Sequence, residues 1–535
     1  MPETSSLRFS TAAQRILASF QKSNELPDDG GNKIHVSDTV SRLASVYEKI
    51  RNIIDYKEEH LLRKNAIHRI LRRRLLGGAA AKTVAHPLIV ELIQARYLPN
   101  DKVPEKTVQT VEQIIDRYLK LSFYTGQTLG WQDRDEQQRW LVGLAAVEIE
   151  QAVSSNAREK AMADAMYEVM LKDLIIVDAD RIDPKVRNLQ IFLSIHRALL
   201  KSDESMIAYT LFRLYVPDWG TIDDLGLQNL APRFAEVRNE IEVQQHHKAG
   251  EFLLRIMKRY TSFFWIMRDV CEEKPSSSVA IFASQTLLDE SIRRAAARRY
   301  ADARARLRRS VIRSFIFIFL TKMLLAFIIE VPFELFVKGV VDRKTLAINT
   351  LFHPLFMFLI AATTGIPGKK NTDRLITGIH EITYKDSGRQ LVKKVRLPRK
   401  RGRLMRSAVA FLYTATFFIT FGLIFKVLSA LGFNIVSGAL FVFFLTIISF
   451  FAVRIRISAR EFVVLEQREG PLGFIVDFFS LPILRVGRWI ALRAPKVNIV
   501  LFIFDFLIEA PFKSFLEILE ELTSFLREKK EEISS

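Results

Sequence analysis

Apolar side chains recur every three or four residues through the first 270 positions, which is the spacing of one face of an α-helix. Between about 38 and 76, Leu43, Ile50 and Ile54 fall on such a face, and a glycine pair follows. Alternation of apolar and polar residues, the pattern of a strand, is not sustained anywhere before residue 375. Further helices are expected at about 83–97, 106–122, 134–173, 184–200, 203–215, 230–245 and 247–272. The sequence therefore predicts an all-α fold that begins with a cytosolic helical domain over residues 1–275.

The stretch EEKPSSS at 272–278 interrupts the helical spacing with a proline and three serines, so a domain boundary is expected there. One long helix, with no further breaker, is predicted from about 279 to 329. Its first half contains nine arginines and one aspartate between Ser291 and Arg313, and its second half is the apolar run SFIFIFLTKMLLAFII. Residues 276–310 would then form a basic helical stalk that leads into a bilayer.

Four apolar runs have close to the roughly 20 residues that an α-helix needs to cross the hydrocarbon of a bilayer. A soluble protein can bury one such helix, but four within one region favour a membrane domain. We therefore expect a multi-pass integral membrane protein with a four-helix transmembrane domain over residues 311–454. The four runs lie at about 311–330, 345–364, 407–428 and 433–453.

Basic residues set the expected orientation, because loops rich in Lys and Arg stay on the cytoplasmic side. The connection 365–406 has thirteen Lys or Arg and three acidic residues, whereas the turn SALGFN between the last two runs has no charge. Arginines also precede the first run and follow the fourth. Both termini are then cytoplasmic. A bacterial cytoplasmic membrane is the expected location, and an organellar inner membrane would follow the same physics.

Two further regions are expected on the cytoplasmic side. Within 365–406, residues that favour strands lie on both sides of KDSG and predict a small β-hairpin. Residues 455–535 contain shorter apolar stretches broken by charge and proline, which is typical of amphipathic helices in the headgroup plane. Whether residues 474–512 span, re-enter or lie on the membrane stays open.

The net charge of +19 indicates an anionic partner. Because the charge is concentrated beside the apolar runs and not on a recognisable nucleic-acid module, anionic lipid headgroups are favoured over a specific nucleic acid. The residues expected to contact anionic lipid are Arg304, Arg306, Arg308, Arg309, Arg313, Arg399, Lys400, Arg401 and Arg403.

Two ten-residue stretches, FIIEVPFELF at 327–336 and FLIEAPFKSF at 506–515, are identical at six positions. In both, a glutamate and a proline end an apolar run, and a proline in the first helical turn starts a new helix. We interpret the motif as a bend at the membrane surface, with the glutamate hydrated; a duplicated element is the alternative. Its residues are Glu330, Pro332 and Phe333 in the first copy, and Glu509, Pro511 and Phe512 in the second.

Lys322 lies near the middle of the first apolar run, where a charge is unfavourable by about 2.5–3.5 kcal/mol unless it has a partner or a hydrated cavity. Glu330 and Glu334 are four residues apart near the end of the first run, and His353 lies in the second run just before Pro354. Together with Lys322 they could form an intramembrane ion or proton site. The alternative is structural, with Lys322 extending toward the interface and both glutamates at the membrane surface.

Motifs for catalysis are weak throughout the chain. A single cysteine excludes a cysteine-rich metal site, and neither a nucleophile elbow nor a dinucleotide-binding glycine pattern occurs. No cofactor and no catalytic or metal residue is therefore expected. The sequence favours a non-enzymatic membrane protein whose helical domain is a docking module or scaffold for a protein partner. An ion- or proton-coupled transporter or channel is the rival hypothesis.

Overall fold

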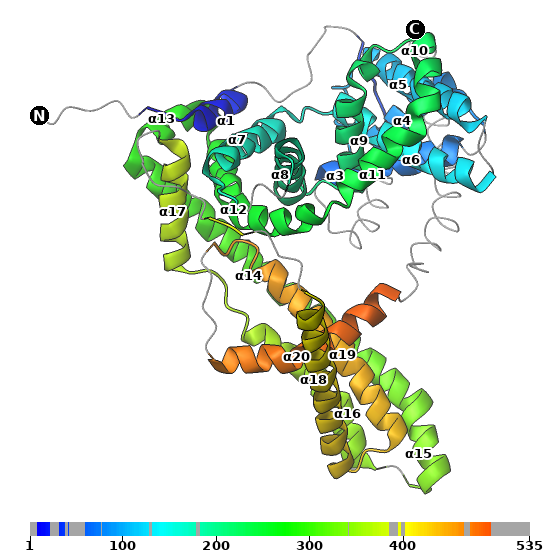
Figure 1. The fold of residues 1–535 in the computed structure, drawn as a ribbon, viewed down its shortest axis with the longest axis vertical. Coiled ribbons are helices and arrows are strands. Elements are labelled where there is room, and N and C mark those ends of the chain that lie inside the picture. The colour runs from blue at the N-terminus through cyan, green and yellow to red at the C-terminus, as the bar shows by residue number, and fades with distance from the viewer. Residues whose placement is uncertain are drawn as a thin grey trace, which may run out of the picture.

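The computed structural model, drawn in Figure 1, is helical throughout the part of the chain that it describes. Isolated bridges such as Phe9 with Tyr384 occur there, but no strands. The predicted all-α class is therefore confirmed at that level. The described residues are 8–21, 32–37, 41, 59–75, 78–127, 131–177, 182–340, 342–384, 394–396, 402–464 and 471–493.

Two hydrophobic cores organise the first 300 residues. The first lobe surrounds Phe212, Trp219 and Phe234 and is built from α3 (Glu59–Leu75), α4 (Ala81–Gln94), α5 (Lys106–Gly126), α6 (Trp131–Val153), α9 (Glu204–Tyr215), α10 (Asp224–Leu230) and α11 (Phe234–Gln245). The second lobe surrounds Phe263 and Phe264 and includes α1 (Thr11–Gln21), α7 (Ala157–Asp173), α8 (Pro184–Leu199) and α12 (Lys248–Glu273). Each lobe buries large aromatic side chains, so each has a core of its own.

Most expected helices of these lobes are present, with two changes. The helix expected at 134–173 is two helices, because residues 154–156 leave the helical conformation between α6 and α7. Serine and asparagine side chains bond to nearby backbone and favour such breaks. Of the long helix expected at 38–76, the structure describes residue 41 and residues 59–75. Residues 59–75 form α3.

The long helix expected from 279 to 329 is interrupted twice. An extended Ser284 separates α13 (Ser278–Ala283) from α14 (Gln285–Leu325), and a π-helical turn, η5 (Ala326–Glu330), joins α14 to α15 (Val331–Lys338). The first turns of α14 bury Leu288, Ile292 and Ala296 in the core of the second lobe. The segment expected as a basic stalk into the bilayer therefore begins as part of that core.

Within the described part of the chain, three helices are long and apolar enough to cross a membrane: Gln285–Phe336, which joins α14 to α15; α18 (Arg403–Ala430); and residues 435–457 of α19 (Ile435–Ala459). Outward-facing apolar side chains such as Phe317, Phe336 and Phe418 give these helices a surface suited to lipid. The second predicted run lies in α16 (Arg343–Ala362), which packs on α14 and α19. Figure 1 shows this bundle extending away from the two lobes along α14.

The β-hairpin predicted within 365–406 is wrong for its first arm, which is the helix α17 (Lys369–Thr383). Leu375, Ile379 and Ile382 are buried at intervals of four and three, so one helical face packs into the second lobe. Residues 385–393, which include the expected turn, lie outside the described part. Val395 forms a single bridge with Ile176 of the second lobe.

The last described helix, α20 (Pro471–Arg493), runs across α18 and α19 near the end that faces the lobes (Figure 1). A Cβ atom at Gly487 would lie 2.0 Å from the backbone oxygen of Thr446 in α19, so the two helices meet at a residue without a side chain. Residues 494–512 lie outside the described part, so only the first part of the open region 474–512 is placed.

Candidate functional site

The second lobe contains three segments that arrive from the bundle. The start of α14, the helix α17 and residues 460–464 after α19 all contribute buried side chains to its core. Asn371 of α17 joins them: its amide nitrogen donates to the hydroxyl of Tyr300 at 2.8 Å and to the carbonyl of Phe462 at 2.9 Å, and its oxygen accepts from the amide of Val464 at 2.8 Å. This Asn371 joint connects α14, α17 and the chain after α19.

Inside the bundle, two of the predicted site residues share one buried amide. Lys322 donates to the side-chain oxygen of Asn349 at 2.5 Å, and the nitrogen of that amide donates to Glu330 at 2.7 Å. Lys322 and Glu330 are each 2% exposed, so both charges depend on the protein for solvation. Asn349 orients its dipole toward both charges and forms an amide-bridged ion pair between α14, η5 and α16.

His353 lies one helical turn after Asn349 and is fully buried. Its Nδ1 is 3.1 Å from the carbonyl oxygen of Asn349, and its Nε2 is 3.0 Å from the carbonyl oxygen of Phe441 in α19. A neutral imidazole can donate from only one nitrogen, so both contacts are hydrogen bonds only in the imidazolium form. Phe444 lies beside both Lys322 and His353, with its ring centroid 4.6 Å from the ammonium of Lys322.

Glu334, the fourth predicted site residue, has separate partners at the far end of the bundle. One of its oxygens accepts from the backbone amide of Asp342 at 2.9 Å, and the other accepts from the amide of Asn434 at 3.1 Å. Asp342 bonds the first turn of α16, and Asn434 bonds the amide of Ser437 in the first turn of α19. Glu334 therefore holds two helix starts together, through partners other than those of the amide-bridged ion pair.

The first copy of the repeated motif differs from the predicted bend. Pro332 is the second residue of α15, and the chain stays helical from Gln285 to Phe336. A π-helical turn lies just before the proline and accommodates it without ending the helix. Glu330 is buried instead of hydrated at the surface. Of the second copy, Glu509, Pro511 and Phe512 lie outside the described residues.

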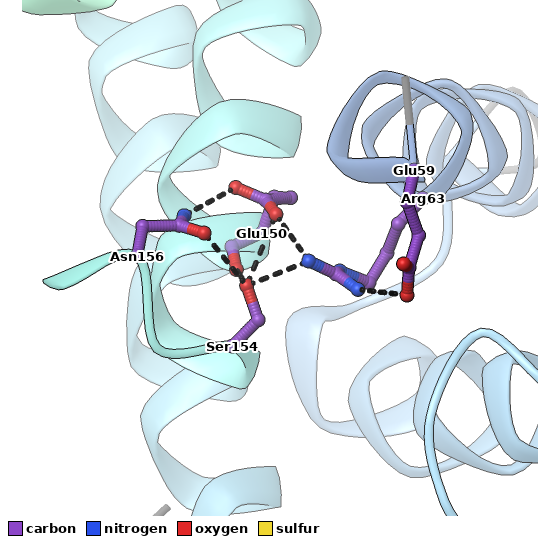
Figure 2. Close-up of polar contacts among 5 residues, drawn as sticks. All are labelled: Glu59, Arg63, Glu150, Ser154 and Asn156. Carbon is purple, nitrogen blue, oxygen red and sulfur yellow. Dashed lines mark hydrogen bonds and ion pairs between the residues drawn. The ribbon is translucent and has the colours of Figure 1, made fainter. Parts of the chain in front are cut away.

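A cavity of about 1460 Å³ opens where the two lobes meet the bundle. Ten Lys or Arg and four Glu line it, so its walls are strongly basic. Figure 2 shows part of the wall, where Arg63 reaches from α3 to Glu150 and Ser154 of the α6 end, at 2.8 Å to each. Asn156 donates to the same carboxylate at 3.0 Å. Both oxygens of Glu150, which lies behind the lining residues Arg63, Ser154 and Asn156, thus accept hydrogen bonds.

The arginines expected to contact lipid divide into two faces of α14. Arg306, Arg309 and Arg313 line the cavity, whereas Arg304 and Arg308 do not. At 100° per residue the first three fall within about 60° around the axis and the other two lie opposite. Arg403, also predicted to contact lipid, is exposed at the start of α18. The remaining predicted contacts, Arg399, Lys400 and Arg401, lie outside the described residues.

Several residues of these sites were not singled out from the sequence. Asn349 is the one asparagine within the second apolar run, which was a usable signal for a buried polar contact. Asn371 carries no local signal, because its role comes from segments far apart in the chain.

Among the described residues, no group of three or more His, Cys, Asp or Glu is placed to hold a metal ion. Comparison of the chain with protein families, with curated proteins and with solved structures finds no match.

Proposed function

We propose that this chain is a four-span membrane protein whose helical lobes form a docking scaffold held at the cytoplasmic surface. The observation that carries the proposal is the Asn371 joint, together with the three segments that enter the core of the second lobe. A lobe built from segments on both sides of each span pair cannot rotate freely on a linker. It is suited to present a partner at a fixed height and orientation.

A parity argument supports four spans. The start of α14, the helix α17 and residues 460–464 contact one lobe, so they lie on one side of the membrane. The chain must then cross an even number of times between consecutive contacts. Since α14 leaves the lobe, α16 is the return span; α18 and α19 form the second pair. At 20 residues, α16 is about 30 Å long, which matches the hydrocarbon thickness.

The orientation follows from charge. The helix α17 of the basic connection 365–406 packs into the second lobe, and basic loops stay in the cytoplasm. Both termini are proposed to be on that side, in a bacterial cytoplasmic membrane.

The docking face is proposed on the first lobe, where two large apolar side chains remain exposed on neighbouring helices. Phe123 of α5 is 66% exposed and Leu225 of α10 is 64% exposed. Lys120 pairs with Asp224 at 2.9 Å and holds α5 and α10 together beside them. Exposed apolar side chains that lie together on a surface mark sites of protein interaction.

The test places a photo-crosslinking residue at Phe123 or Leu225 of the full chain in its native membrane. A discrete protein adduct from both positions is expected. Lys274, an exposed residue of the second lobe, is the control position and should give none. If both test positions give no adduct, or the same background as Lys274, the docking proposal is refuted.

A second function, an ion or proton path, is favoured by the amide-bridged ion pair and by the two carbonyl contacts of His353. In this hypothesis Lys322, Asn349 and Glu330 move charge between α14 and α16. Purified protein in liposomes would be compared with Lys322→Met and with Lys426→Met, which removes an exposed lysine of α18. Flux that Lys322→Met abolishes and Lys426→Met leaves unchanged would establish the path. Absence of flux in the unsubstituted protein would exclude it.

A further inference from the structure

Three arginines at the membrane-facing end of the basic cavity are left without partners. Arg306 and Arg309 come from α14, and Arg454 comes from the end of α19. All three are exposed, and none has an ion-pair or hydrogen-bond partner among the described residues. Elsewhere on the wall the basic groups are engaged: Lys201 pairs with Glu461, and Arg299 pairs with Asp269. The unpartnered charge is therefore concentrated at one end of the cavity.

That end lies at the level where the apolar surface of the bundle stops. Ile318 of α14 and Ala452 of α19 pack in one apolar cluster, so the two helices are in register there. Arg309 lies about two and a half turns before Ile318, and Arg454 is two residues after Ala452. The arginines of both helices thus face the interface between hydrocarbon and water, where phospholipid headgroups lie.

We infer that this end of the cavity binds the phosphate of an anionic phospholipid. Guanidinium groups bind phosphate oxygens through paired, charge-assisted hydrogen bonds, and these three arginines line one cavity from two helices. Phe451 and Ile455, which line the same cavity, offer an apolar surface to the acyl chains. The inference rests on the placement of α14 and α19 in the bilayer and not on the docking role.

The same helix supplies a matched control. Arg304 and Arg308 are also exposed and without a partner among the described residues, but they lie on the face of α14 away from the cavity. General attraction to an anionic membrane would depend on both faces alike. A binding site would depend only on the cavity face.

The experiment measures lipid binding to the delipidated full chain in a non-ionic detergent by native mass spectrometry. The probes are dioctanoyl phosphatidylglycerol, dioctanoyl phosphatidylcholine and glycerol phosphate. Phosphatidylglycerol should bind most tightly. Arg306→Gln with Arg309→Gln should weaken that binding by at least about tenfold, and Arg454→Gln alone by a smaller factor in the same direction. Arg304→Gln with Arg308→Gln should change it by less than about twofold.

Three results would overturn the inference. Equal weakening by the two double variants would show surface attraction without a site. Equal affinity for glycerol phosphate and for phosphatidylglycerol would show a site for a soluble phosphate compound. Equal affinity for the two lipids would show that the negative charge is not recognised. A thermal melt of each variant that matches the unsubstituted chain confirms that the exposed substitutions leave the fold intact.

Discussion

Replacing Asn371 by alanine tests whether the lobe and the bundle are built as one unit. The substitution removes three hydrogen bonds, to Tyr300, Phe462 and Val464, between groups that are mostly buried. Each bond contributes about 1 kcal/mol, and a buried group left without a partner costs more. The joint should therefore lose about 3 kcal/mol of local stability.

Hydrogen exchange followed by mass spectrometry measures that loss directly. In the unsubstituted chain the amide of Val464 donates to Asn371 and should exchange slowly. A loss of about 3 kcal/mol corresponds to exchange about 100-fold faster in peptides that cover residues 460–464 and the start of α17. Peptides from the first lobe, which has its own core, should not change.

Lys370→Ala is the matched control, because Lys370 is the neighbouring residue of α17, is exposed and has no partner among the described residues. Its effect should stay within about 0.5 kcal/mol. A free-energy change of about 0.5 kcal/mol corresponds to a factor of about two in exchange rate. If exchange in Asn371→Ala differs from that in Lys370→Ala by no more than about twofold, the proposed role of the joint is refuted.

Three further predictions follow from burial and close contact. Gly487→Ala should lower the thermal midpoint, because its Cβ would lie 2.0 Å from a backbone oxygen, whereas Gly422→Ala, with nothing within 4 Å, should not. Burial raises the pKa of Cys271 to about 12, so maleimide should leave this thiol unlabelled at neutral pH until the chain is denatured; rapid labelling would contradict its burial. Burial lowers the pKa of His196 to about 4, so the unfolded chain binds its proton first as the pH falls. Stability should then decrease by up to about 3 kcal/mol between pH 6.5 and 4, and an unfolding titration of His196→Gln should lack that decrease.

The helical class and the apolar helices could be predicted from sequence because spacing and length are local properties. The fold of α17 was not, because its threonines and isoleucines favour strands, while the intervals of Leu375, Ile379 and Ile382 fit a helix. Packing against the second lobe decides between the two. A Cβ at Gly378 would lie 2.3 Å from the ring of Phe263, so that packing is close.

The candidate sites were predictable only in part. Lys322 and Glu330 stood out because charge within an apolar run is unfavourable. Their shared partner Asn349 is 27 residues from Lys322, and no local pattern connects the two. The predicted arginine cluster on α14 was one group in sequence, but helical geometry divides it into two faces. Only the packing of α14 against α19 determines which face lines the cavity.

The most direct test of the account is the side of the membrane on which three single cysteines lie, in a Cys271→Ala background. The positions are Val340 before α16, Lys370 in α17 and Ser429 at the end of α18, all exposed in the structure. The four-span account predicts that a membrane-impermeant maleimide added outside labels the cysteines at 340 and 429. It should label the cysteine at 370 only after permeabilisation. Labelling of 340 and 370 from the same side would show that α16 does not cross the membrane and would contradict the account.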